Sequence, residues 1–99
     1  MSLVTAVTII AKVVAKPASV EKVKGELLKL VEPTRKEPGC IVYRLHQDNT
    51  DQAQFVFYER WESAEHLQKH MQSDHFKRFQ SVLADSIATT AVQKLTGLE

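Results

Sequence analysis

The chain has 99 residues and a formal net charge of +1, with 43% hydrophobic and 25% charged residues. This length allows one domain, which we expect to span residues 1–99. The near-neutral charge argues against nucleic acid or an anionic membrane as the main partner. The single cysteine, Cys40, excludes an internal disulfide and fits a reducing compartment. Without a membrane-length apolar stretch or a recognisable signal peptide, we expect a cytoplasmic protein.

The first predicted element is a long strand over residues Val4–Ala15, which are rich in Val, Ile, Thr and Ala. Apolar residues occur on both of its faces, for example Ile9 and Val13 on one and Ile10 and Val14 on the other. Both faces should therefore be covered. One layer of helices can cover a single face, so the other face requires a partner.

A helix follows the first strand, and it begins at Pro17 or Ser19. It must end by Glu37, because Pro38 and Gly39 force a turn. Apolar residues recur on one face at helical spacing, namely Val20, Val23, Leu27, Leu30 and Val31.

Two further strands, Cys40–Asp48 and Gln54–Trp61, flank the turn-forming residues 49–51 and predict a hairpin. Ser63 is a plausible N-cap for a short helix, and Ser73 or Asp74 caps another. The first of these helices carries Ala64, Leu67 and Met71 inward, and the second buries Phe76, Phe79, Val82 and Leu83. Residues Ala88–Leu98 are predicted to form the last strand.

The resulting order is β-α-β-β-α-β, with the second helix broken in two. This is the ferredoxin-like order of an α+β fold, in which helices cover one face of a four-stranded antiparallel sheet. The uncovered face is apolar, so we expect two copies to pair face to face. The predicted assembly is a homodimer that forms a dimeric α+β barrel.

Alternation along the hairpin places Glu59 on the same face as three large aromatic residues of its strand, Phe55, Phe57 and Trp61. One interpretation is an acid near the strand end that pairs with a basic neighbour or reaches water. The other is a pocket acid with a raised pKa, able to transfer a proton.

Four histidines are further candidates. His66 and His70 lie four residues apart, which a zinc pair can use, but the HExxH context and an evident third ligand are absent. We therefore expect no metal site. His70 points partly toward the sheet near Trp61, where a structural and a catalytic role are equally open, as they are for His46. His66 and His75 are expected at the solvated surface.

Several cofactor and nucleophile motifs are missing from the sequence, including GxGxxG, the Walker loop and CxxC. Cys40 begins a strand after a Pro-Gly turn, which favours a packing role over a nucleophilic one. A chain of this size has no room for a nicotinamide or flavin domain beside a substrate site, so we expect no cofactor. Redox chemistry would then draw its electrons from the substrate, which suits a quinol or polyphenol whose anion reduces oxygen directly.

Two blocks of the sequence carry a resemblance to a known family. Residues 32–48 read EPTRKEPGCIVYRLHQD, and residues 55–70 read FVFYERWESAEHLQKH, followed by SDHF at 73–76. With the strand order, these blocks resemble the antibiotic biosynthesis monooxygenase (ABM) domain family over nearly the whole chain. The haem-degrading members use an asparagine on the first strand, which is missing between residues 4 and 15.

The resemblance implies cofactor-independent oxidation of a quinol or hydroxylated, polyketide-like aromatic by O2, in a homodimer with one pocket per subunit. We expect three proton-transfer candidates, His70, His46 and Glu59, and three ring-stacking residues, Trp61, Tyr43 and Phe57. Because the family is functionally mixed, two alternatives remain. One is an isomerase of a small phosphorylated sugar-like or autoinducer-2-derived metabolite, and the other is a non-catalytic dimer that binds an aromatic ligand.

Overall fold

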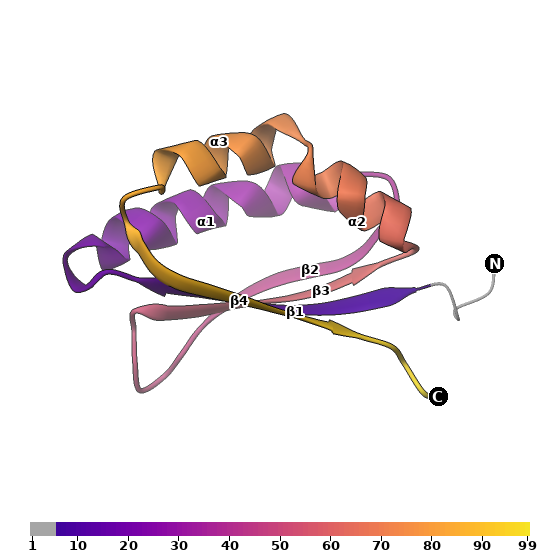
Figure 1. Ribbon diagram of the computed structural model, residues 1–99, viewed down its shortest axis with the longest axis horizontal. Helices are drawn as coiled ribbons and strands as arrows, with labels where there is room; N and C mark the ends of the chain where they lie inside the picture. Colours follow the sequence, from indigo (N-terminus) through magenta and orange to yellow (C-terminus); the bar gives the residue numbers. More distant parts are fainter. Residues whose placement is uncertain (1–5) are drawn as a thin grey trace.

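The computed structural model describes residues 6–99 as an antiparallel sheet with helices over one face (Figure 1). The strands follow the spatial order β2-β3-β1-β4, which confirms the predicted ferredoxin-like α+β fold. The elements in chain order are β1 (Val7–Ala15), a 3-10 turn (Pro17–Ser19), α1 (Val20–Arg35), β2 (Cys40–Gln47), β3 (Gln54–Trp61), α2 (Ala64–Met71), α3 (Asp74–Val82) and β4 (Ile87–Leu95).

The predicted ends of the first and last strands differ from the structure. Val4, the predicted start of the first strand, lies outside the described residues. The last strand was expected over Ala88–Leu98, but β4 ends at Leu95. Its final ladder pair joins Leu95 to Thr8 near the start of β1, and the residues beyond Leu95 are not assigned to a strand.

Ser63 caps α2 as predicted, and Ser73, one of the two predicted candidates with Asp74, caps α3. The Ser63 hydroxyl accepts a hydrogen bond from the backbone N–H of His66 at the start of α2. The Ser73 hydroxyl accepts one from the backbone N–H of Phe76 at the start of α3. Each cap satisfies a donor that the first helical turn leaves unpaired, and so fixes where the helix begins.

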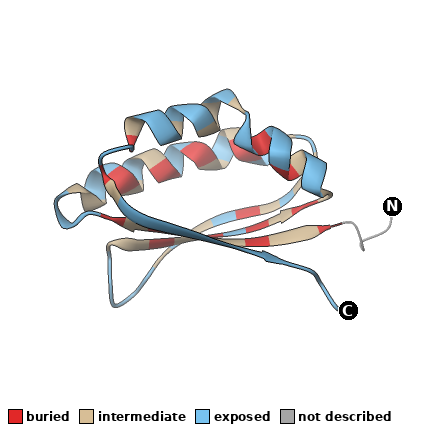
Figure 2. Ribbon diagram, viewed as in Figure 1, coloured by how far each residue is buried: buried red, intermediate tan, exposed pale blue. Residues whose placement is uncertain are grey.

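The core lies between the sheet and the helix layer. Buried residues on the helices face the sheet, and buried residues on the central strands face the helices (Figure 2). The largest cluster members with almost no exposed surface are Ile9, Val23, Leu27, Phe55, Trp61 and Leu83. Over residues 6–99, the opposite face of the sheet has no element against it, and no helix is long and apolar enough to cross a membrane.

A β-bulge changes the predicted alternation at the start of β2. Cys40 pairs with Trp61 and Val42 pairs with Arg60, so Ile41 is the extra residue between two consecutive pairs. Cys40 consequently packs against the core, although simple alternation along β2 would place it with Val42 on the opposite face. The same bulge leaves Ile41 44% exposed.

Gly39 is expected to be the most sensitive glycine. Its φ of +82° lies in the left-handed region, and an added Cβ would overlap the side chain of His66. Gly39→Ala should therefore destabilise the fold by about 1–3 kcal/mol, measured by urea unfolding. Gly25→Ala is the control, because Gly25 lies in an exposed turn of α1 where the new Cβ would meet nothing within 4 Å beyond its chain neighbours and the helix's own backbone. It should stabilise by about 0.5–1 kcal/mol, and equal effects of the two changes would contradict this account.

Candidate functional site

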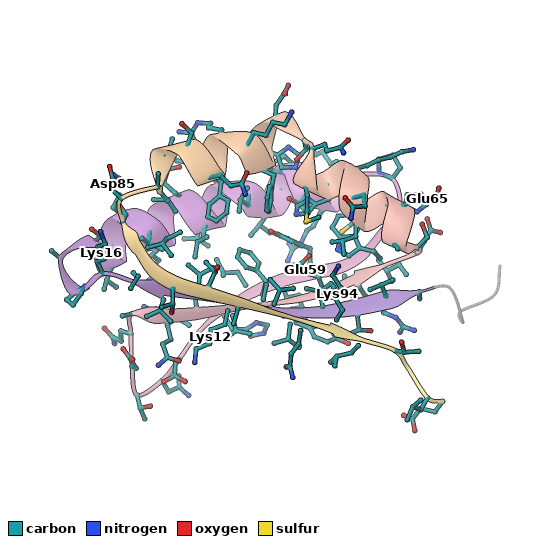
Figure 3. All side chains as sticks on the ribbon, viewed as in Figure 1. Lys12, Lys16, Glu59, Glu65, Asp85 and Lys94 are labelled. Carbon is teal, nitrogen blue, oxygen red and sulfur yellow. The ribbon has the colours of Figure 1, made fainter. Side chains whose placement is uncertain are left out.

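A pocket of about 560 Å³ lies between the β1–β4 half of the sheet and helices α2 and α3 (Figure 3). Its walls are mainly apolar, with Phe57 and Val92 from the sheet and Met71, Phe76 and Phe79 from the helices. A concave apolar site with a few polar groups is the usual form of a small-molecule site.

One row of paired residues crosses the sheet beneath this pocket. Lys94 of β4 pairs with Ile9 of β1, Ile9 pairs with Glu59 of β3, and Glu59 pairs with Tyr43 of β2. Directly paired residues project from the same face of a sheet, so all four side chains point toward the helices. All four line the pocket.

His70 occupies the helix side of the pocket. It lies in the last turn of α2 and is only 2% exposed. Its ring centroid is 4.8 Å from that of Trp61, 5.0 Å from Phe76 and 5.6 Å from Tyr43. Burial lowers the pKa of His70, and the neighbouring carboxylate of Glu37 opposes this without reversing it.

The carboxylate of Glu37 holds two histidines. Its Oε2 lies 2.7 Å from Nδ1 of His70 and 2.7 Å from Nε2 of His75. Glu37 comes from the loop after α1, and His75 from the first turn of α3. One oxygen thus accepts a hydrogen bond from each ring, so the proton on His70 resides on Nδ1 and leaves Nε2 with its lone pair.

The same three residues could hold a metal ion. Their ligand atoms lie within 4.8 Å of one another. Two imidazoles and a carboxylate are ligands that Zn²⁺ and Fe²⁺ accept. The hydrogen bonds described above already satisfy the ligand atoms of these three side chains.

Glu59 lies beside Trp61 at the bottom of the pocket. The indole Nε1 donates a hydrogen bond of 3.0 Å to Oε1 of Glu59, which is 5% exposed. Burial raises the pKa of Glu59 more than this hydrogen bond lowers it. No hydrogen bond or ion pair from a basic side chain reaches this carboxyl within residues 6–99. The geometry thus favours the pocket-acid interpretation.

Two other protic groups on β2 keep their protons near neutral pH. Burial raises the pKa of Tyr43 well above its ordinary value, and the charge of Glu59 adds to this. Burial also raises the pKa of the Cys40 thiol to about 11, with smaller contributions from Glu37 and Glu59. Cys40 is therefore a poor nucleophile, as its position after a Pro-Gly turn suggested.

The structure brings most of the predicted site residues together. Four of them line the pocket, namely His70, Glu59, Tyr43 and Phe57. Trp61 is fully buried and lies behind the pocket, where it contacts His70 and Glu59. In this position its ring supports the two polar groups and leaves no exposed face on which a ligand could stack.

His46 is separated from this group. It pairs with Val56 on the opposite face of the sheet, where its Nδ1 lies 3.3 Å from the Val56 carbonyl oxygen. It is exposed and does not line the pocket. The alternation of β2 already places His46 and Tyr43 on different faces, so the two cannot serve one site within a single chain.

Sequence reasoning missed Glu37 and misplaced His75, which was expected at the solvated surface. His75 is half buried because its ring turns toward Glu37. The one local signal was a carboxylate immediately before the turn that leads into β2. That turn directs Glu37 toward the junction of α2 and α3, a position that only the packing of the helices defines.

Comparison with known proteins identifies the family of this chain. The sequence model of the antibiotic biosynthesis monooxygenase family matches residues 6–82. The chain belongs to this family. The match ends before β4, so the strand that carries Lys94 lies outside the part of the ABM domain that the family model defines.

Individual relatives are similar over most of the chain. A Pseudomonas aeruginosa protein of known crystal structure is 33% identical, with a TM-score of 0.95 and full coverage of both chains. An uncharacterised Synechocystis protein is 30% identical over 90% of this chain, which spans only 60% of that relative. A Mycobacterium tuberculosis protein, provisionally named a monooxygenase, is 28% identical over 90% of this chain and 91% of its own length. Its structure superposes with a TM-score of 0.88, covering 95% of this chain and 96% of that one.

The raised pKa of Glu59 predicts that the effect of Glu59→Gln on the free energy of unfolding depends on pH. A carboxyl whose pKa is higher in the folded state costs stability as pH rises above its unfolded value of about 4.5. The stability of the Gln variant relative to the unchanged protein should therefore increase between about pH 4 and pH 7. Urea unfolding across this range measures it, with the exposed Glu32→Gln as the control for loss of one charge. A difference for Glu59 that does not change with pH would contradict the desolvation of this carboxyl.

Proposed function

We propose that this ABM domain is a cofactor-independent monooxygenase that oxidises a quinol or a related hydroxylated aromatic with O2. The observation that carries the proposal is the buried His70, whose Nδ1 is held by Glu37 while its ring lines an apolar pocket. A phenolic ring fits walls built from aromatic and aliphatic side chains.

The first step is removal of a phenolic proton. Because Glu37 accepts the Nδ1 hydrogen of His70, Nε2 is the nitrogen that can take this proton. Burial keeps the free imidazole neutral, as a general base must be. Once His70 is protonated, the carboxylate of Glu37 stabilises the imidazolium by charge and hydrogen bonding.

The substrate anion then supplies the electrons. One electron passes to O2, and the resulting aryloxyl radical and superoxide combine to form a C–O bond on the ring. That ring carbon then loses its proton to the outer peroxide oxygen. The O–O bond breaks at the same time, which leaves a ring carbonyl and hydroxide. Hydroxide takes the proton from the His70 imidazolium and becomes water. A quinol and O2 thus give a hydroxyquinone and one water.

Glu59 acts as the acid of the site, whereas His70 acts as the base. Burial favours its protonated form, in which it can donate a hydrogen bond to an oxygen of the bound ring or of the peroxide. Trp61 fixes its orientation through Oε1 and leaves the second oxygen for the ligand. Tyr43 and Phe57 would contact the ring from the sheet, where both line the pocket.

An isomerase is the second candidate, and the same two groups favour it. A base and a protonated acid lining one pocket could move a proton between two carbons of a small oxidised metabolite. This reaction requires no oxygen. Product formation by a degassed sample would therefore identify it, whereas saturable ligand binding without any product would identify a non-catalytic binding domain.

His70→Ala should lower turnover of an accepted quinol by on the order of 10²–10⁴-fold, because it removes the general base. The measurement is O2 consumption with a panel of quinols, without added flavin or metal. His46→Ala is the matched control, since its ring lies on the opposite face of the sheet and should leave the rate unchanged. The proposal fails if the unchanged protein oxidises every quinol no faster than buffer does.

A homodimer completes the fold in this proposal, because the outer face of the sheet is uncovered in a single chain. Ile10, Val14 and Val56 are half buried on this face, and Tyr58 is 38% exposed. The buried Nε of Arg60, on the same face, has no hydrogen-bond partner among residues 6–99. A second copy packed against this face would remove the apolar side chains from water and could supply an acceptor for Arg60.

Tyr58→Lys should weaken this dimer at least about tenfold, because it places an unpaired charge at the interface beside Arg44. Tyr58→Phe keeps the ring and should remain dimeric. Sedimentation equilibrium measures both variants. A monomeric unchanged protein at micromolar concentration would overturn the assembly, and dimerisation of the Lys variant equal to that of the Phe variant would place the interface elsewhere.

A further inference from the structure

Two lysines line the pocket, Lys12 and Lys94, and the proposed chemistry uses neither of them. Lys94 lies on β4, in the row that continues through Ile9 to Glu59. Figure 3 shows Lys94 and Glu59 on the helix side of the sheet and Lys12 on the opposite side. Neighbouring strands are about 4.8 Å apart, so the backbones at Lys94 and Glu59 are separated by about 10 Å.

Lys94 has no counter-charge within residues 6–99. The ion pairs of this part of the chain involve the carboxylates of Glu26 and Glu37. Glu59 is bound by Trp61, and an ammonium group is not among the causes that shift the pKa of this carboxyl. Lys94 is therefore an exposed residue beside an apolar pocket, and no ion pair within residues 6–99 neutralises its ammonium group.

We infer that Lys94 forms an anion subsite and that the substrate is an aromatic ring carrying both a hydroxyl and a carboxylate. This inference rests on the proposed function, since it assigns the second end of the same substrate. Lys94 would bind the carboxylate at the β4 edge while the ring hydroxyl reaches His70 over β2 and β3. The span between the two ends suits one ring with a substituent at each end.

The walls of the pocket favour an aromatic acid over a sugar phosphate. The wall residues Phe57, Phe76 and Phe79 offer no hydrogen bonds to the hydroxyls of a sugar, and the polar lining residues, which include Gln80, Thr89 and Thr90, are outnumbered by apolar ones. Leaving those hydroxyls unpaired would cost binding free energy.

The test compares two ligands that differ by one carboxylate, 1,4-dihydroxybenzene and 2,5-dihydroxybenzoate, by calorimetric titration without oxygen. We expect the unchanged protein to bind the acid about tenfold more tightly. Lys94→Met keeps an unbranched side chain without charge and should abolish this preference, whereas Lys94→Arg should retain it. Lys16→Met removes an exposed lysine outside the pocket and should behave as the unchanged protein. Thermal melts check that each variant is folded.

Equal affinity for the two ligands, binding of neither, or a preference that survives Lys94→Met would overturn the inference. Tighter binding of ribose 5-phosphate than of the dihydroxybenzoate would overturn the inference that the substrate is aromatic. Oxygen consumption separates the two proposals. If quinols are oxidised without any preference for the acid, the subsite fails and the proposed function stands. If the acid binds through Lys94 and no quinol consumes oxygen, the subsite stands and the proposed function fails.

Discussion

The hydrogen bonds from His70 and His75 to Glu37 join three segments that are distant in the chain. Glu37 follows α1, His70 ends α2 and His75 begins α3, so one carboxylate ties the helix layer together at the edge of the pocket. A buried imidazole without a partner would cost free energy, and a carboxylate beside it without donors would cost more. The same bonds that stabilise this corner fix the tautomer of His70, so structure and chemistry depend on one contact.

The buried surroundings of His70 and Glu59 favour different roles for these two ionisable groups, a base and an acid. Burial favours the uncharged form of each, which is the proton-free form for His70 and the protonated form for Glu59. Burial thus shifts an acid and a base that face the same space toward their neutral forms. Trp61 contacts both, as a donor to Glu59 and as a packing surface for His70, and this explains why a fully buried residue can matter to the site.

The pocket has two chemically different ends. One end presents the ionisable groups of His70 and Glu59, and the other presents the Lys94 ammonium group on β4. The sheet connects them, because its register places all three side chains on one face. A rigid sheet holds the distance between the two ends constant, which is what a site that selects substrates by length requires.

The sequence alone determined the features that depend on neighbouring residues. Alternation placed Glu59 on the face of Phe57 and separated His46 from Tyr43, and serine caps located both short helices, since each signal acts within a few residues. Only the tertiary structure decided the rest. Glu37 contacts His70 across 33 residues and His75 across 38, and Lys94 meets the pocket through the pairing of β4 with β1. The predicted self-pairing of the sheet stays a prediction. The pocket follows from the packing of the helices on the sheet. That packing depends on the shape of every side chain in the core and produces no periodic pattern in the sequence.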